Sequence, residues 1–206
     1  IPKPFDSRLI LRIAPAVAQA AEASGVATRP IADMQAYRER LGTLVTHTGL
    51  FMRPMFHAAK AASALAKRVI YAEGEDPRVL RAAQMALDEG IASPLLIGRH
   101  DIIARRIEEL GLHIRIGQDV GIVDPVDNPH HQSYSEKYYQ LMGREGVSAE
   151  AAKAIVQRNH SVIAALAVRM GDADAMVCGL YGSFDKHLQV VRDVIGLDKD
   201  AGIFAA

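Results

Sequence analysis

The chain has 206 residues, 50% of them hydrophobic, and its 24 basic residues balance 24 acidic ones. This is enough for one large or two small globular domains, and the absence of net charge argues against nucleic acid or an anionic membrane surface as a partner. No apolar stretch is long enough to span a bilayer. The single cysteine, Cys178, allows no intrachain disulfide, so we expect core packing for this side chain and a cytoplasmic location.

The ends of the sequence lack the features of natural termini. Residues 1–5 have no initiator Met and no signal-peptide pattern, and residues 202–206 form an apolar segment that stops abruptly. We therefore expect this chain to be a piece of a longer protein.

The first helix is predicted to follow Asp6, which can cap it, and to stop at Gly25. Pro15 interrupts this pattern and should kink the helix or split it in two. Its apolar positions follow helical spacing and are Leu9, Ile10, Ile13, Val17 and Ala21.

Two more helices are expected before residue 66, one from about Asp33 and one from about Pro54. His47 and His57 lie in this region without carboxylate or cysteine neighbours at a metal-ligand spacing. A structural or solvated role is therefore predicted for both histidines.

After residue 66, short β-rich runs alternate with amphipathic helices. The expected strands are 68–72, 94–98, 113–116, 120–124 and a buried strand from Ala175. The expected helices are 78–90, 101–110, 133–142, 148–170 with a break near Asn159, and one from Asp185. This rhythm predicts an α/β fold in which a helical lead-in is followed by a mostly parallel sheet with helices on both faces.

The helix at 78–90 has the clearest start signal, because Asp76 is a good N-cap and Pro77 suits the first helical position. The side chains expected to be buried on it are Val79, Ala82, Ala83, Ala86 and Leu87.

Ligands of parallel sheets gather beyond the carboxyl ends of the strands, where two segments of this chain are placed. In the first, 73–76, Glu73, Glu75 and Asp76 can either ligate Mg²⁺ or hold an arginine, or Asp76 caps the helix and the glutamates are solvated. His130 and His131 are expected in a surface loop and not at a metal site.

The second segment, 179–187, has glycines followed by small and polar residues that open a helix. Gly179 and Gly182 permit close backbone approach of an anion, although a plain connection between strand and helix has the same pattern. No serine has a visible base and orienting acid, and no GxGxxG or GxxxxGK motif occurs in the sequence.

Two stretches carry a resemblance to known families. The opening IPKPFDSRLILRIAPAVAQAA, followed by SGVATRPI at 24–31, resembles the end of the nucleotide-binding domain of bacterial malic enzymes. The region from KRVIYAEGEDPRVL at 67–80 to DADAMVCG at 172–179 resembles the first part of phosphate acetyltransferase. This order is typical of the hybrid NADP-dependent malic enzymes.

The resemblance implies three parts: helices of a malic enzyme nucleotide-binding domain at 1–48, a helical linker at 49–66, and the first α/β subdomain of a phosphate acetyltransferase-like regulatory domain at 67–206. It also implies that the intact protein oxidatively decarboxylates malate to pyruvate with NADP and Mg²⁺ or Mn²⁺, and is a homo-oligomer. The catalytic, metal-binding and cofactor-binding residues of that family precede this segment, and a second α/β subdomain follows it. We therefore expect no catalytic or metal-binding residue here, and no malic enzyme activity or bound cofactor for the segment alone.

The segment departs from active transferases at positions that matter for chemistry. In the family, a pair of small residues, an Asp and an Arg follow the last strand, whereas this chain has Ser183-Phe184, Lys186 and Gln189. A second family arginine is replaced by Met142. Without these fixed guanidinium groups, turnover of an anionic substrate should be lost while the fold is kept.

We therefore expect a degenerate domain that senses acetyl-CoA and regulates the enzyme allosterically. Its candidate ligand-binding residues, in a vestigial acyl-CoA or phosphate cleft, are Gly179, Gly182, Ser183, Lys186, His187, Gln189 and Arg192. Two alternatives stay open: an active phosphate acetyltransferase, and a purely structural oligomerisation domain.

Overall fold

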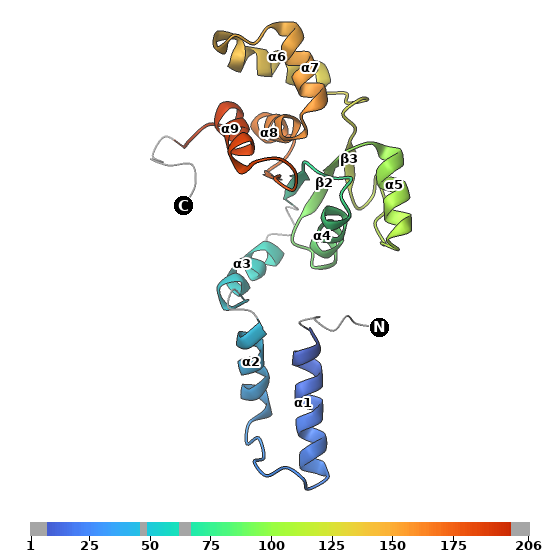
Figure 1. Ribbon diagram of the computed structural model, residues 1–206, viewed down its shortest axis with the longest axis vertical. Helices are drawn as coiled ribbons and strands as arrows, with labels where there is room; N and C mark the ends of the chain where they lie inside the picture. The colour runs from blue at the N-terminus through green and yellow to red at the C-terminus, as the bar shows by residue number, and fades with distance from the viewer. Residues whose placement is uncertain (1–7, 46–48, 62–66, 199–206) are drawn as a thin grey trace. The chain divides into compact units, whose positions relative to one another are not determined.

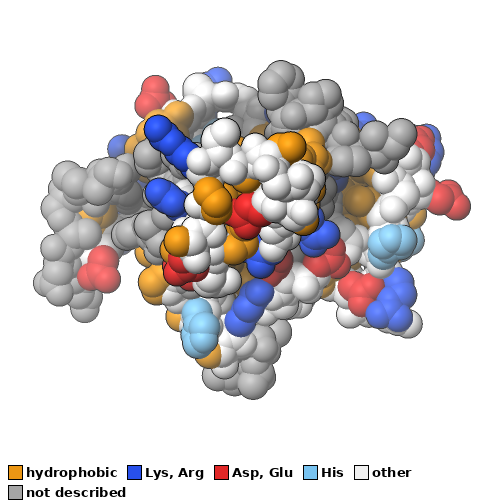
Figure 2. Space-filling model, turned by 90° about the horizontal axis from the view of Figure 1, so that it is seen from below, with side chains coloured by type: hydrophobic (Ala, Val, Ile, Leu, Met, Phe, Trp, Pro, Cys, Tyr) orange, Lys and Arg blue, Asp and Glu red, His pale blue; other side chains and the backbone are white. Residues whose placement is uncertain are grey.

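The computed structural model describes residues 8–45, 49–61 and 67–198, which form two compact units, Ile1–Ala58 and Ala59–Ala206 (Figure 1). Asp6 and His47, singled out above, lie outside the described residues. Within the described ranges, no helix has the length and apolar character needed to cross a membrane. On the face drawn in Figure 2, basic and acidic side chains are interspersed, so no patch of a single sign covers that face.

The first unit is helical, as predicted. It contains α1 (Arg8–Ala23) and α2 (Met34–Val45), and α3 (Gly49–Ala61) spans its end. Pro15 is buried inside α1 without splitting it, and Gly25 follows the helix with a φ of 76°. α3 begins at Gly49, earlier than predicted, because Pro54 is accommodated inside the helix instead of starting it.

The second unit contains a sheet of four parallel strands in the order β3-β2-β1-β4. The strands are β1 (Arg68–Tyr71), β2 (Ser93–Ile97), β3 (Gly121–Val123) and β4 (Ala175–Val177). In their register, Ile70 lies opposite Leu95 on one side and Met176 on the other. The predicted parallel α/β architecture is confirmed.

The strand predicted at 113–116 is wrong. Residues 115–120 form a turn there, in which the backbone N–H and the guanidinium of Arg115 both donate to Asp119, and Gly117 N donates to Val120 O at 2.8 Å. Only a single bridge, between Ile116 and Val120, has β character. The alternating apolar pattern is therefore used to bury Ile114 and not to form a strand.

The helices of this unit lie where the sequence places them. They are α4 (Pro77–Asp88), α5 (His100–Glu109), α6 (His131–Met142), α7 (Ala149–Arg158), α8 (His160–Met170) and α9 (Phe184–Val194), with a 3-10 turn at Gly143–Glu145. The predicted break at Asn159 is confirmed, because its Oδ1 accepts from the backbone of Ser161 and Val162 and caps α8.

Two predictions within these helices need correction. Ala82 is exposed, and Leu80, which lies on the opposite side of α4, is fully buried in its place. His131 is the first residue of α6 and not part of a loop, because Asn128 accepts hydrogen bonds from the N–H groups of both His130 and His131.

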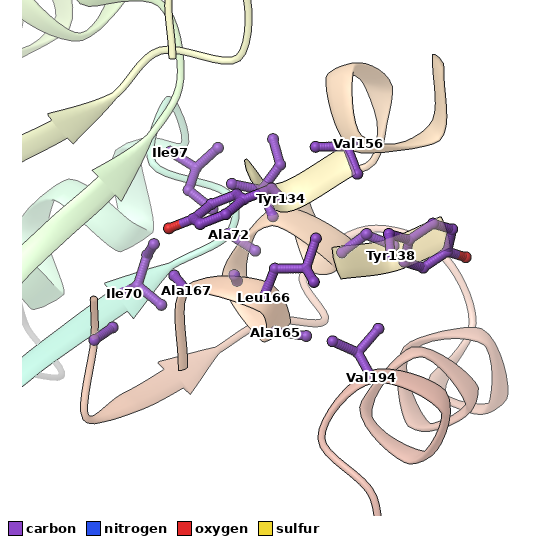
Figure 3. Close-up of a cluster of buried hydrophobic side chains, with 14 of the residues drawn as sticks. Ile70, Ala72, Ile97, Tyr134, Tyr138, Val156, Ala165, Leu166, Ala167 and Val194 are labelled. Carbon is purple, nitrogen blue, oxygen red and sulfur yellow. The ribbon is translucent and has the colours of Figure 1, made fainter. Parts of the chain in front are cut away.

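Helices cover both faces of the sheet, as predicted. On one face, Leu96 packs with side chains of α4 and α5 such as Leu80 and Ile103. On the other face, Ile70 and Ile97 pack against α8, including Leu166, and α6 and α9 add to this core (Figure 3).

β4 is an edge strand, so the prediction of a buried strand is wrong. Met176 packs against the core, whereas Ala175 is exposed and Val177 is 49% exposed. Cys178 is partly buried against the same core, in agreement with its expected packing role, and burial raises the pKa of its thiol. An apolar run alone does not distinguish an edge strand from a central one.

Candidate functional site

The turns after β1 and β4 lie side by side at the point where the strand order reverses. In the sheet, β1 lies between β2 and β4, so its carboxyl end is a topological switch point. Ala72 N donates to Val177 O at 3.0 Å, and Gly179 N donates to Glu73 Oε1 at 2.9 Å. Such crevices are the usual ligand sites of open α/β sheets, and the two segments in which we expect ligand-binding residues lie next to each other here.

The carboxylates after β1 are committed to protein groups. Asp76 caps α4 by accepting from Arg78 N, and it also accepts from the Arg78 guanidinium at 3.0 Å and from the Tyr181 hydroxyl. These bonds hold the pKa of Asp76 well below its ordinary value, although burial alone would raise it. The capping role is confirmed.

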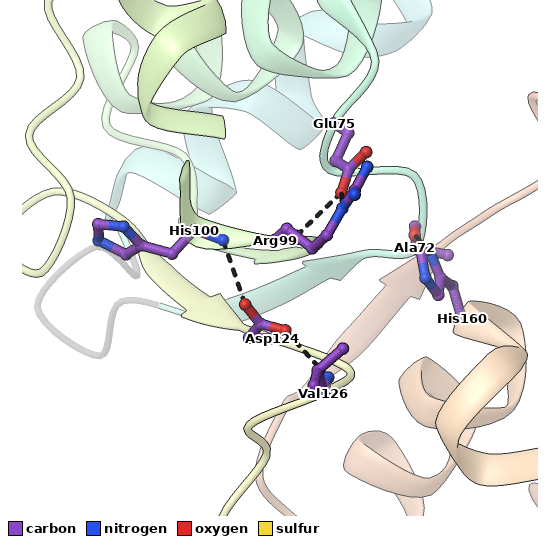
Figure 4. Close-up of polar contacts among 7 residues, drawn as sticks. All are labelled: Ala72, Glu75, Arg99, His100, Asp124, Val126 and His160. Atoms are coloured by element: carbon purple, nitrogen blue, oxygen red, sulfur yellow. Dashed lines mark hydrogen bonds and ion pairs between the residues drawn. The ribbon is translucent and has the colours of Figure 1, made fainter. Parts of the chain in front are cut away.

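Glu75 has a similar role toward the next turn of the sheet. It accepts from the backbone N–H of Arg99 at 2.9 Å and from Arg99 Nε at 3.2 Å, while Asp124 accepts from the N–H groups of His100 and Val126 (Figure 4). The arginine-holding alternative is therefore confirmed and solvated glutamates are not found. No set of three metal-ligating side chains occurs among the residues that the structure describes.

The turn after β4 is shaped by its glycines and tied down by Tyr181. Gly179 and Gly182 have φ values of 113° and 96°, which favour glycine. Tyr181 is 61% exposed, and the guanidinium carbon of Arg78 lies 5.9 Å from the centroid of its ring. The backbone carbonyl oxygen of Tyr181 accepts from His187 Nε2 at 2.6 Å.

His187 connects this turn to the start of α8. A carbonyl oxygen can only accept, so Nε2 of His187 carries the proton and Nδ1 accepts from the hydroxyl of Ser161 at 2.9 Å. His160, the neighbour of Ser161, donates from Nδ1 to Ala72 O at 3.0 Å (Figure 4). The two histidines thus fix α8 to the carboxyl ends of both β1 and β4.

A hollow of about 500 Å³ lies at this switch point. That volume is within the range of small-molecule sites. Its lining side chains are Glu73, Ala154, Ile155, Arg158, Asn159, His160, Ser161, Tyr181 and His187.

The seven candidate ligand-binding residues divide between two places. His187 lines the switch-point hollow, and Gly179 and Gly182 shape the turn beside it. Ser183 occupies the N-cap position of α9 without a side-chain capping bond, and Lys186 is exposed in the first turn.

Gln189 and Arg192 line a different hollow, of about 570 Å³, between α6 and α9. Met142 lies in the same hollow. The two positions at which the resemblance implies lost arginines therefore lie close together, 47 residues apart in sequence. Arg192 contributes a guanidinium to the lining of this hollow, and its Nε donates to Asp193 Oδ1 at 3.0 Å. Glu145 adds a second carboxylate to the same lining.

No sequence pattern indicated Arg158, Ser161 or Tyr181 as site residues. The sequence nevertheless contains one indication of a site at this position, because the predicted helix break at Asn159 places the start of a new helix near the sheet. Which strand end that start approaches depends on strand order, which the sequence pattern does not contain.

Comparisons with known proteins agree with this architecture. The family model described as phosphate acetyl/butaryl transferase matches residues 50–206. A phosphotransacetylase structure from Streptococcus pyogenes has the same fold, with a TM-score of 0.61 at 23% identity over 69% of this chain and 42% of that one.

Curated relatives extend the similarity over nearly the whole chain. An NAD-dependent malic enzyme of Rhizobium meliloti is 54% identical over 95% of this chain, and an NADP-dependent malic enzyme of Haemophilus influenzae is 50% identical over 96%. The chain spans about a quarter of their length, 25% and 26% respectively. These matches confirm the resemblance to malic enzymes, and the chain belongs to the phosphate acetyl/butaryl transferase family.

Proposed function

We propose that this chain is a segment of a malic enzyme, which oxidatively decarboxylates malate to pyruvate, and that its transferase-like part regulates the enzyme by binding acetyl-CoA. The assignment to a malic enzyme rests on one observation. The similarity to malic enzymes covers residues on both sides of position 50, where the match to the transferase family begins. A free-standing transferase would not need the helical unit that precedes this position.

The redox chemistry belongs to other parts of the intact protein. NADP and Mg²⁺ or Mn²⁺ are the cofactors we propose for it, and relatives named as NAD-dependent and as NADP-dependent are about equally similar. The residues of this chain do not fit either group, because they contain no glycine-rich dinucleotide motif and, in the described ranges, no metal-ligating cluster. Malate-dependent reduction of NADP and of NAD by the intact protein, with and without Mg²⁺, tests this assignment.

The hollow between α6 and α9 supports the loss of acetyl transfer. Transfer to or from phosphate needs fixed cations around the anionic substrate. Met142 and Gln189 are neutral, Arg192 is already paired with Asp193, and the carboxylates of Glu145 and Asp193 repel phosphate. We therefore expect this part of the intact protein to make no acetyl phosphate.

The switch-point hollow supports binding without chemistry. Its volume suits part of a coenzyme A molecule, and the turn at 179–187 beside it leads into the N-terminus of α9, where Lys186 is exposed. An effector held there would regulate a distant reaction only if it binds two states of the protein differently.

One experiment on the intact protein separates the three functions. We expect acetyl-CoA to change the rate of malate turnover, while acetyl phosphate formation from acetyl-CoA and phosphate stays at background. Formation within about tenfold of the typical enzyme turnover of ~10 s⁻¹ would establish an active transferase. Absence of any acetyl-CoA binding would leave oligomerisation as the function of this domain.

A further inference from the structure

We propose that Arg158 binds a phosphate group of the effector in the switch-point hollow. This inference rests on the proposed acetyl-CoA binding and adds the residue that recognises its anionic part. It concerns a side chain outside the candidate ligand-binding set at 179–192.

Arg158 is the cation in this hollow that is available to a ligand. It is the last residue of α7, it is exposed, and it makes no hydrogen bond or ion pair with any other residue in the described part of the chain. The other arginines near the switch point are already paired, Arg78 with Asp76 and Arg99 with Glu75. A guanidinium with all five N–H donors free is well suited to bidentate phosphate binding.

The side-chain amide of Asn159, next to Arg158, also presents donors. Asn159 uses Oδ1 to accept from the backbone of α8, which leaves its NH₂ group for a ligand. His160 adds no donor in its neutral form, because Nδ1 donates to Ala72 O and Nε2 is then an acceptor. Since Ser161 and His187 are bonded to one another, they offer little to an anion, and the strongest anion-binding group of this lining is Arg158.

The negative charge of Glu73 determines which part of the ligand lies next to Arg158. Its carboxylate lines the same hollow and has one oxygen bonded to Gly179 N. A phosphate is repelled from this carboxylate, whereas an amide N–H is attracted to it. Acetyl-CoA contains both, with phosphates at the nucleotide end and amide N–H groups in the pantetheine arm, so the phosphates are directed to Arg158.

The test combines one substitution with one truncated ligand, measured by calorimetric titration of the intact protein. Arg158→Gln should weaken acetyl-CoA binding roughly ten- to a hundred-fold, the effect of losing one charge-assisted hydrogen bond. It should leave the affinity for acetyl-pantetheine, which has the thioester and amides but no phosphate, unchanged. Arg144→Gln is the matched control, because Arg144 is an exposed arginine that does not line this hollow and should affect neither ligand.

The outcomes separate this inference from the function on which it rests. If the wild-type protein binds acetyl-CoA and Arg158→Gln binds it equally well, or loses both ligands to the same degree, the role of Arg158 is overturned and acetyl-CoA sensing stands. If the wild-type protein does not bind acetyl-CoA, both proposals fall. Loss of acetyl-CoA affinity alone establishes the phosphate contact.

Discussion

Replacing Asp76 should loosen the turn after β1, because this carboxylate holds three groups at once. It caps α4 through Arg78 N at 2.8 Å, accepts two hydrogen bonds of 3.0 Å from the Arg78 guanidinium, and accepts a third from the hydroxyl of Tyr181. Its side chain is only 4% exposed. Asp76→Ala therefore removes the N-cap of α4 and the bond that joins this helix to the turn after β4.

The size of the effect follows from the parts that water cannot replace. Loss of an Asp N-cap costs about 1 kcal/mol, and loss of the part-buried hydrogen bond from the Tyr181 hydroxyl to a charged group costs about 2 kcal/mol. The Arg78 side chain is 62% exposed and returns to water, so its two bonds are not counted in addition. The sum is about 3 kcal/mol, or about a hundredfold in the local opening equilibrium. Asp76→Asn keeps the cap and should cost about half as much.

Hydrogen exchange of the intact protein, followed by mass spectrometry, reports this opening. We expect peptides from α4 to exchange about a hundredfold faster in Asp76→Ala and about tenfold faster in Asp76→Asn. Peptides from α5 are the internal reference. Asp127→Ala, which changes an exposed loop carboxylate, is the control and should have no effect. Wild-type exchange of α4 in both Asp76 variants would refute the reasoning.

The same carboxylate predicts a pH dependence. The pKa of Asp76 is lower in the folded protein than in the unfolded chain, where it is about 3.9, so its stabilising effect is complete above that value and is lost as the pH falls below it. After correction for intrinsic rates, protection of α4 should decrease from about pH 5 to pH 3 in the wild type. It should decrease less in Asp76→Asn, and equal slopes would contradict the assigned sign.

The remaining stability predictions concern two glycines and one tyrosine, each measured as the urea midpoint of the intact protein. Gly74→Ala should cost about 3 kcal/mol or more, because a Cβ there would lie 2.7 Å from the carbonyl oxygen of Ile97, which is fixed in β2. Gly171→Ala, with a φ of 83° but open space around it, should cost only about 1 kcal/mol, and an equal loss for both would contradict the steric argument. Tyr134→Phe should cost about 1–2 kcal/mol, because it removes a 2.8 Å hydrogen bond to Asp172 from a buried ring, and an unchanged midpoint would show that this bond contributes nothing.

Local patterns were sufficient for the fold class but not for the arrangement of its parts. Capping and periodicity placed α4 and the break at Asn159 correctly, because these features depend on neighbours a few residues away. Strand order and the edge position of β4 depend on pairing between residues about a hundred positions apart, such as Val69 with Ala175. The failed strand at 113–116 gives way to a turn in which Asp119 accepts from the backbone and guanidinium of Arg115 and Gly117 N donates to Val120 O.

The positions of the two turns at the candidate site were predicted from the sequence, but their contacts were not. The turns at 73–76 and 179–187 were expected at the carboxyl ends of strands, and they lie there. The bond from Tyr181 to Asp76 spans 105 residues and follows no sequence rule. The same holds for the hollow beside α8, because its lining comes from three separate segments of the chain, at 73, 154–161 and 181–187.

Lys186 and Arg158 can be tested against one another as anion-binding groups. Lys186 is exposed in the first turn of α9, and its ammonium has no partner among the residues that the structure describes. Lys186→Ala should shift the acetyl-CoA response of malate turnover roughly ten- to a hundred-fold in concentration, with little change in turnover without effector.

Ser183→Ala should shift the response less, because this hydroxyl makes no capping bond at the start of α9 and contributes no charge. The double variant, Arg158→Gln with Lys186→Ala, then shows whether both cations bind one phosphate. Free-energy losses that add within about 0.5 kcal/mol indicate two separate phosphate groups, and a smaller combined loss indicates a shared one. If neither Lys186→Ala nor Ser183→Ala moves the response curve, the turn at 179–187 is not the sensor. Its glycines and Tyr181 then serve only to connect β4 to α9.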